Sequence, residues 1–173
     1  MNNELRMLIN NLTQDIIDHY DIQIPIENIE KVVNDIGGRI EVSFDIDNIY
    51  DGSIKKENNN FVIFVSPYQS PERKKFTIAH ELGHLFLHMG YNINSELWDN
   101  QENSTYYRSG DSIEEYQANE FAAALLMPRE RYKEIMDQNT RGTIVETEKI
   151  ADYFGVSVSA ASNRGKFLGY LQW

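Results

Sequence analysis

The sequence predicts an α+β fold that is mainly helical and contains a small β-sheet. Three observations support this class. Apolar residues recur every three or four positions near the start of the chain, a β-rich region lies within residues 39–66, and strongly helical segments return after it. Because helices, strands and helices follow one another in blocks, the pattern favours α+β over an alternating α/β fold.

At 173 residues, the chain is long enough for one domain with a sizeable core. We expect residues 1–140 to form this domain and residues 141–173 to form a C-terminal segment packed on it. The first residues lack the basic and apolar regions of a signal peptide, and no stretch is apolar enough for a transmembrane helix. The chain has no cysteine, which fits a reducing compartment, so we expect a cytoplasmic protein.

The first two elements are predicted to be helices. Residues 4–19 carry apolar side chains at helical spacing, and residues 26–36 repeat this pattern after a proline. Two glycines, Gly37 and Gly38, provide a C-terminal stop for the second helix.

The sheet is expected to follow directly. Residues 39–47 alternate between apolar and polar, which predicts a half-buried strand. Its inward side chains should be Ile40, Val42, Phe44 and Ile46. Residues 51–60, "DGSIKKENNN", indicate a turn or hairpin loop. Residues 61–66, "FVIFVS", indicate a more deeply buried strand.

A long helix should begin at Ser70, with Pro71 in the first position and Glu72 in the first turn, and should run to about Met89. Residues 91–111 are polar and unpatterned, which predicts a long loop of the kind that is often functional.

Another helix is expected at residues 113–126, and a short charged helix after Pro128. The tail then predicts two short helices around a tight turn at Gly155, a helix-turn-helix-like arrangement.

The stretch "FTIAHELGHLFLH" contains three of the four histidines. On a helix, His80 and His84 lie one turn apart on the same face, so both imidazoles can reach one zinc ion. Glu81 lies on the flank, where a carboxylate can take a proton from a water that zinc has made more acidic. Gly83 is expected to keep one flank of the helix open.

His88 lies a further turn along, about 10–12 Å by axial rise from His80, which is too far for a shared zinc ion. We expect it to support the site, to pack, or to face the substrate. His88 is also one of four candidates for stabilising an oxyanion, together with Tyr106, Tyr107 and Arg108.

A catalytic zinc site needs a third protein ligand, and the helix at 113–126 supplies acids. Glu114, Glu115 and Glu120 are all candidates. Glu115 shares the apolar face of this helix, but it could instead complete a capping box with Ser112. Asn119 lies one turn after Glu115, where it could hydrogen-bond the far nitrogen of a zinc-bound histidine.

Two stretches, "RKKFTIAHELGHLFLH" and "EEYQANEFAAALLMP", strongly resemble the ImmA/IrrE family of bacterial and phage metallo-endopeptidases. The resemblance covers about residues 60–170. It implies a zincin-like peptidase domain, related to gluzincins, with Zn²⁺ held by His80, His84 and Glu115. It also implies Glu81 as the catalytic acid/base, and a helix-turn-helix repressor of a phage, mobile element or stress response as the protein substrate.

The net charge of −11 argues against direct binding of nucleic acid. The helix-turn-helix-like tail is not expected to bind DNA either, because residues 144–173 carry three basic and three acidic side chains. We expect it to dock a repressor or to be structural. An alternative function is a non-catalytic zinc-containing module that binds a repressor or antitoxin. The intact Glu81 argues against this alternative, since a structural site needs no base.

Overall fold

The computed structural model describes residues 2–44, 52–101 and 112–172. In these ranges the chain forms helices and two small sheets, which confirms the predicted α+β class. The helices are α1 (Asn3–His19), α2 (Ile29–Ile36), α3 (Pro71–Leu87), α4 (Ser95–Asp99), α5 (Ile113–Leu126), α6 (Arg129–Gln138), α7 (Thr147–Phe154) and α8 (Val158–Phe167). The strands are β1 (Arg39–Val42), β2 (Gly52–Glu57), β3 (Asn60–Val65), β4 (Thr140–Arg141) and β5 (Ile144–Val145).

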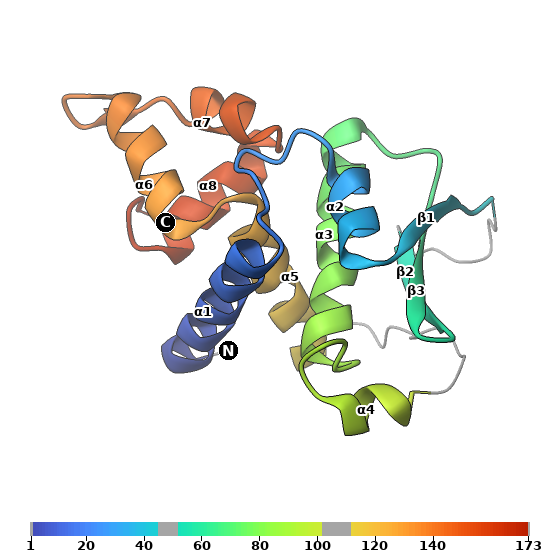
Figure 1. Cartoon of the computed structure of the whole chain (residues 1–173). Coiled ribbons are helices and arrows are strands. Elements are labelled where there is room, and N and C mark those ends of the chain that lie inside the picture. The colour runs from blue at the N-terminus through green and yellow to red at the C-terminus, as the bar shows by residue number, and fades with distance from the viewer. Residues whose placement is uncertain (1, 45–51, 102–111, 173) are drawn as a thin grey trace.

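Helices α3 and α5 pack closely against each other in the middle of the molecule. Figure 1 shows the three-stranded sheet on one side of this pair and helices α6–α8 on the other, with α1 beside α5. The core includes Ile78, Leu82 and Leu85 of α3, together with Phe61 and Ile63 of β3, all without exposed surface. The helix that carries His80 and His84 is therefore packed on both sides.

The main sheet has the strand order β1-β3-β2. Strand β1 runs parallel to β3, with Ile40 opposite Ile63, and β2 runs antiparallel to β3, with Ile54 opposite the same residue. Because β3 is central and lies against α3, its side chains are deeply buried, as predicted for residues 61–66.

The turn predicted over residues 51–60 is wrong for most of its length. Residues 52–57 form strand β2, and only Asn58 and Asn59 make the turn into β3. The strand has one large apolar side chain, Ile54, so its own pattern is weak. Pairing along the whole of β3 specifies it instead.

The inward face predicted for residues 39–47 is also wrong. Strand β1 ends at Val42, which is 51% exposed, and Phe44 is 68% exposed. Ile40 is only partly buried, and Ile46 lies outside the described residues. As a short edge strand, β1 pairs on one side only and receives little cover from the helices.

The loop predicted over residues 91–111 contains helix α4, while residues 102–111 lie outside the described part of the chain. Lys56 of β2 is nearly buried and donates from Nζ to the carbonyl oxygen of Trp98 over 2.6 Å. The same ammonium lies 4.8 Å from the centre of the Trp98 ring. A lysine on the sheet therefore holds α4.

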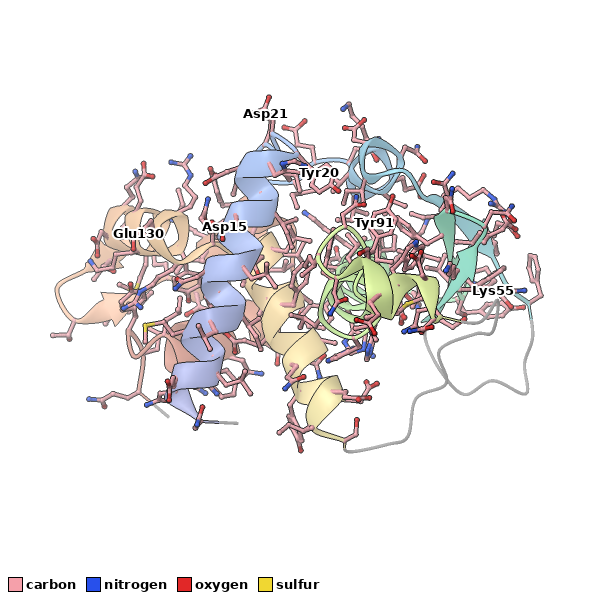
Figure 2. The ribbon with its side chains drawn as sticks, turned by 60° about the horizontal axis from the view of Figure 1, so that its bottom comes forward. Asp15, Tyr20, Asp21, Lys55, Tyr91 and Glu130 are labelled. Carbon is pink, nitrogen blue, oxygen red and sulfur yellow. The ribbon has the colours of Figure 1, made fainter. Side chains whose placement is uncertain are left out.

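Tyr91, labelled in Figure 2, fixes the chain where it leaves α3. Its hydroxyl donates to the carbonyl of Ile36 over 3.0 Å, and its ring meets Phe61 and Trp98 edge-on. These contacts tie the end of the histidine helix to α2, β3 and α4 together.

The C-terminal helices α7 and α8 enclose a tight turn, in agreement with the predicted helix-turn-helix shape. Gly155 adopts the left-handed conformation (φ 60°, ψ 48°), and Ser157 caps α8 by accepting from the amide of Ala160. The predicted boundary at residue 140 falls in β4, and Tyr132 of α6 donates to Ala161 of α8 over 2.8 Å. The division into two units stays a prediction. Among the described residues, no helix has the length and apolar character needed to span a bilayer.

Candidate metal centre

Helix α3 presents both histidines of the predicted pair. Ser70 caps the helix by accepting from the amide of Arg73, and Pro71 occupies the first turn. The segment from Thr77 to Phe86 is buried, so His80 and His84 project from a helix that is enclosed by the core.

Three side chains that can bind a metal converge at one point. The Nε2 atoms of His80 and His84 lie 3.0 Å apart. Glu115 of α5 reaches both: its Oε2 lies 3.2 Å from Nε2 of His80, and its Oε1 lies 3.2 Å from Nε2 of His84. All ligand atoms of this set lie within 4.8 Å of one another. The structure thus brings together the three predicted ligands.

This donor set fits a zinc ion. Ligands about 2.0–2.2 Å from a tetrahedral ion lie about 3.3–3.6 Å apart, close to the separations found here. Nδ1 of His80 lies 3.0 Å from the Oδ1 acceptor of Asn119, so this nitrogen carries the proton and Nε2 has the lone pair. Two nitrogens and a carboxylate facing one another form an acceptor-rich site, which a divalent cation satisfies. The contact between His80 and Asn119 is the one predicted from the helical spacing.

His84 is suited to metal binding at neutral pH. Burial, followed by repulsion from His80, lowers the pKa of His84 to about 3, while Glu115 acts in the opposite direction. His84 is therefore neutral over the physiological range, and a metal ligand must be neutral to offer its lone pair.

Glu81 is 1% exposed and lies against the start of β2. A Cβ atom added to Gly52 would lie 3.3 Å from Oε1 of Glu81 and 2.5 Å from Cγ2 of Thr77. Strand β2 can therefore approach the predicted base only because residue 52 has no side chain. The sequence indicated a turn at Gly52 and gave no sign of this role.

His88 lies behind His84 and outside the set of donor atoms. Its Nδ1 lies 2.9 Å from Nδ1 of His84, and its Nε2 lies 2.9 Å from Oε1 of Gln117 on α5. The sequence left the role of His88 open and gave no indication of Gln117.

Gly83 has a different role from the predicted one. A Cβ atom at this position would lie 2.9 Å from Cα of Ala118 and 3.2 Å from Cβ of Phe121. The flank of α3 at Gly83 is closed by α5, and the glycine permits the two helices to touch.

The other acids considered as a third metal ligand do not reach the two histidines. Glu114 is exposed, and Glu120 is buried in an ion pair with Arg164. The amide of Glu115 donates to Ser112, so the backbone half of the predicted capping box is present while the side chain meets the histidines. The oxyanion candidates Tyr106, Tyr107 and Arg108 lie outside the described residues.

Comparison with known proteins agrees with this geometry. The model of a peptidase family, the IrrE N-terminal-like domain, matches residues 40–166. The radiation response metalloprotease IrrE of Deinococcus radiodurans is 33% identical over 113 residues, which are 64% of this chain and 32% of that protein. The protein of the same name from Deinococcus deserti is 33% identical over 112 residues, which are 62% of this chain and 37% of that protein. The chain thus spans about a third of the length of these relatives.

A solved structure is also similar. It is described as a Mycobacterium tuberculosis transcriptional regulator, with a TM-score of 0.55 and 16% identity, and the match covers 95% of this chain and 47% of that one. At this identity the likeness shows the fold alone. The family match, in contrast, covers well over half of the chain and includes α3 and α5 with the whole candidate site. The predicted resemblance is therefore confirmed, and the chain belongs to the family of peptidases that share the IrrE N-terminal-like domain.

Proposed function

We propose that the chain is a zinc-dependent endopeptidase. His80, His84 and Glu115 would hold the ion, and Glu81 would be the catalytic acid/base. The observation that carries this proposal is the convergence of the three donor atoms next to a buried glutamate on the same helix. Membership of a peptidase family and the metalloprotease names of the two relatives support it.

When bound, zinc supplies Lewis-acid chemistry toward the peptide carbonyl and the attacking water. Glu81 takes a proton from this water as its oxygen bonds to the carbonyl carbon, and it gives a proton to the leaving nitrogen as the C–N bond breaks. Asn119 holds the proton of His80 on Nδ1 throughout, so that Nε2 keeps its lone pair. Glu81 lies close to the start of β2, beside Gly52, which leaves space for the carboxylate there.

The substrate we propose is a helix-turn-helix repressor of a phage, mobile element or stress response. A groove of about 810 Å³ between α3, α5 and α8 supports a protein substrate, and its lining includes Asn119, which contacts Nδ1 of His80 in the candidate site. Asn119 and Tyr116 line its end at α5, and Phe76 its wall at α3, while Val158 and Phe167 contribute the face of α8. This volume accommodates several side chains of a peptide segment.

The same groove argues for docking of protein rather than of DNA. The groove is lined by Arg6, Arg73 and Arg164 as well as by Glu72, Glu120 and Asp152, so it lacks the excess of basic side chains that DNA phosphates require. The net charge of −11 adds to this argument. The cytoplasmic location stays a prediction.

The test is incubation of the zinc-loaded protein with the repressor encoded beside it. We expect one specific cut. Glu81→Gln should retain one equivalent of zinc and lose cleavage, whereas Glu130→Gln, an exposed glutamate on α6, should behave as the wild type. Cleavage by Glu81→Gln at the wild-type rate would exclude this mechanism. Zinc binding and a tight complex without any cleavage would instead support the non-catalytic regulatory module.

A further inference from the structure

We infer that Gln117 and His88 are positioning residues that set the tautomer of His84. This inference rests on the proposed metal site, in which Nε2 of His84 is a ligand. It assigns a function to the two polar side chains that lie behind the site.

The three side chains form a continuous chain of hydrogen bonds. Oε1 of Gln117 lies 2.9 Å from Nε2 of His88, and Nδ1 of His88 lies 2.9 Å from Nδ1 of His84. Nε2 of His84 then faces His80 and Glu115. Both imidazoles use both of their nitrogens: His88 joins Gln117 to His84, and His84 joins His88 to the candidate metal centre.

The donor and acceptor in each of these hydrogen bonds follow from the side chain of Gln117. An amide oxygen only accepts, so Nε2 of His88 must donate to Gln117. In a neutral imidazole the other nitrogen then accepts, so Nδ1 of His88 accepts a hydrogen bond from Nδ1–H of His84, which keeps its proton. His84 therefore keeps its lone pair on Nε2, where the metal ligand is needed.

The opposite arrangement of donors and acceptors is incompatible with metal binding by Nε2 of His84. If the amide of Gln117 donated, His84 would carry its proton on Nε2. That proton would point at His80, whose Nε2 lies 3.0 Å away, and would occupy the position of the ion. Only one of the two tautomers is compatible with three converging donors.

Helix α5 thus supplies a ligand and both orienting acceptors. Glu115 meets the two histidines, Asn119 accepts directly from His80, and Gln117 acts on His84 through His88. His88 is the capping residue at the end of α3, one turn after His84, which places it within reach of α5.

The experiment compares two changes at one position. Gln117→Met keeps the size of the side chain but removes the acceptor, and Gln117→Glu keeps an acceptor. Zinc affinity is measured by competition with a chromophoric chelator, and the tautomer of His84 by long-range ¹H–¹⁵N spectra of the metal-free protein. Thermal unfolding checks that each variant is folded.

We expect Gln117→Met to bind zinc about 10–100-fold more weakly and to lose the Nδ1–H tautomer of His84. Gln117→Glu should keep both the wild-type affinity and the tautomer. His88→Ala should resemble Gln117→Met, while His19→Ala, which removes an exposed histidine on α1, should change nothing.

Wild-type affinity and an unchanged tautomer in Gln117→Met would overturn the inference. Failure of the proposed function is distinguishable, because it would appear as an absence of zinc binding in the wild type itself. The nitrogen spectra of the metal-free protein would even then decide whether Gln117 sets the tautomer.

Discussion

Arg164 of α8 and Glu120 of α5 form a buried ion pair, with Nη1 2.9 Å from Oε1 and exposed side-chain fractions of 1% and 6%. Arg6 and Asn10 of α1 also bind the Glu120 carboxylate, over 3.1 and 2.7 Å. Arg164 donates in addition to the carbonyl of Met127 over 3.0 Å. This cluster joins the first helix and the C-terminal segment to the helix that carries Glu115.

Breaking this pair should destabilise the whole fold. Arg164→Met leaves the buried Glu120 carboxylate with Arg6 and Asn10 alone, which should lower the free energy of unfolding by about 1.5–3 kcal/mol. Arg141→Met removes an arginine that is 79% exposed and 3.9 Å from Glu146, and it should cost less than about 1 kcal/mol. Urea titrations of both variants measure the difference. Equal stabilities would show that the buried cluster contributes little.

Strand β2 should be sensitive at Gly52. In Gly52→Ala the new methyl group collides with Thr77, so β2 must move away from α3 or the core must shift. We expect a loss of about 1–3 kcal/mol and a lower kcat for the repressor, because Glu81 loses its neighbour. Gly142→Ala is the control for a glycine without close neighbours, although its left-handed φ of 63° adds a backbone penalty of about 1 kcal/mol. An unchanged kcat in Gly52→Ala would show that the position of β2 does not affect catalysis.

Removal of metal should weaken the protein without unfolding it. The ligands belong to core helices, so the metal-free protein should melt cooperatively at a lower Tm. Zinc at 100 times its Kd should add about 2.7 kcal/mol. Glu115→Ala should abolish this zinc-dependent shift, and the exposed neighbour Glu114→Ala should retain it. Calorimetry with chelator or with zinc measures these changes in Tm. The prediction would be wrong if zinc raised the Tm of the two variants equally.

The groove should govern affinity for the substrate. Val158 of α8 is 47% exposed and lines the groove, so Val158→Asp places a charge on a surface that must be desolvated when a peptide binds. KM for the repressor should rise about tenfold, while kcat and zinc content remain unchanged. Ile144→Asp alters an apolar and more exposed position on β5 (69%) that does not line the groove, and it should leave KM as it is.

Stability at high pH should depend on Tyr132. Burial raises the pKa of Tyr132 to about 12, so the folded state favours the neutral hydroxyl. Its contribution is present below pH 10 and is lost as the pH rises from 10 to 12, by about 2–3 kcal/mol. Tyr132→Phe should be less stable by about 1 kcal/mol at neutral pH, since the bond to Ala161 is lost, but less sensitive to alkali. Tyr68→Phe, at a residue that is 78% exposed, is the control in denaturant titrations at each pH.

The long helices could be predicted because their apolar spacing, caps and stops agree with one another. Strand β2 could not, because one isoleucine and a buried lysine do not form an alternating pattern. The exposed side of β1 was missed for a related reason: alternation shows that a strand has two faces but not that a helix covers one of them. The short helix α4 depends on Lys56 and Trp98, which are distant in sequence.

At the site, helical spacing alone placed His80 and His84 together and set Asn119 against a histidine. It could not choose among Glu114, Glu115 and Glu120, because the first two lie near the apolar face of α5, Glu115 could also have been only a capping residue, and the side of Glu120 was not clear from the spacing. The choice depends on what faces Glu115 and Glu120: the histidines of α3 in one case, and Arg164, over forty residues away, in the other. Gln117 was missed because it acts through another residue.

The contact between α3 and α5 at Gly83 also determines when, during folding, the proposed metal ligands are brought together. Since the backbones of α3 and α5 touch there, the distance from the histidines to Glu115 is set by the crossing of two helices rather than by the reach of flexible side chains. The conformational entropy of arranging the ligands is lost when the core folds, before any ion arrives. In the proposed metal site the ligands are therefore preorganised, so little of the binding free energy would be needed to arrange them. An alanine at position 83 would push α3 and α5 apart and loosen the site without altering any proposed ligand.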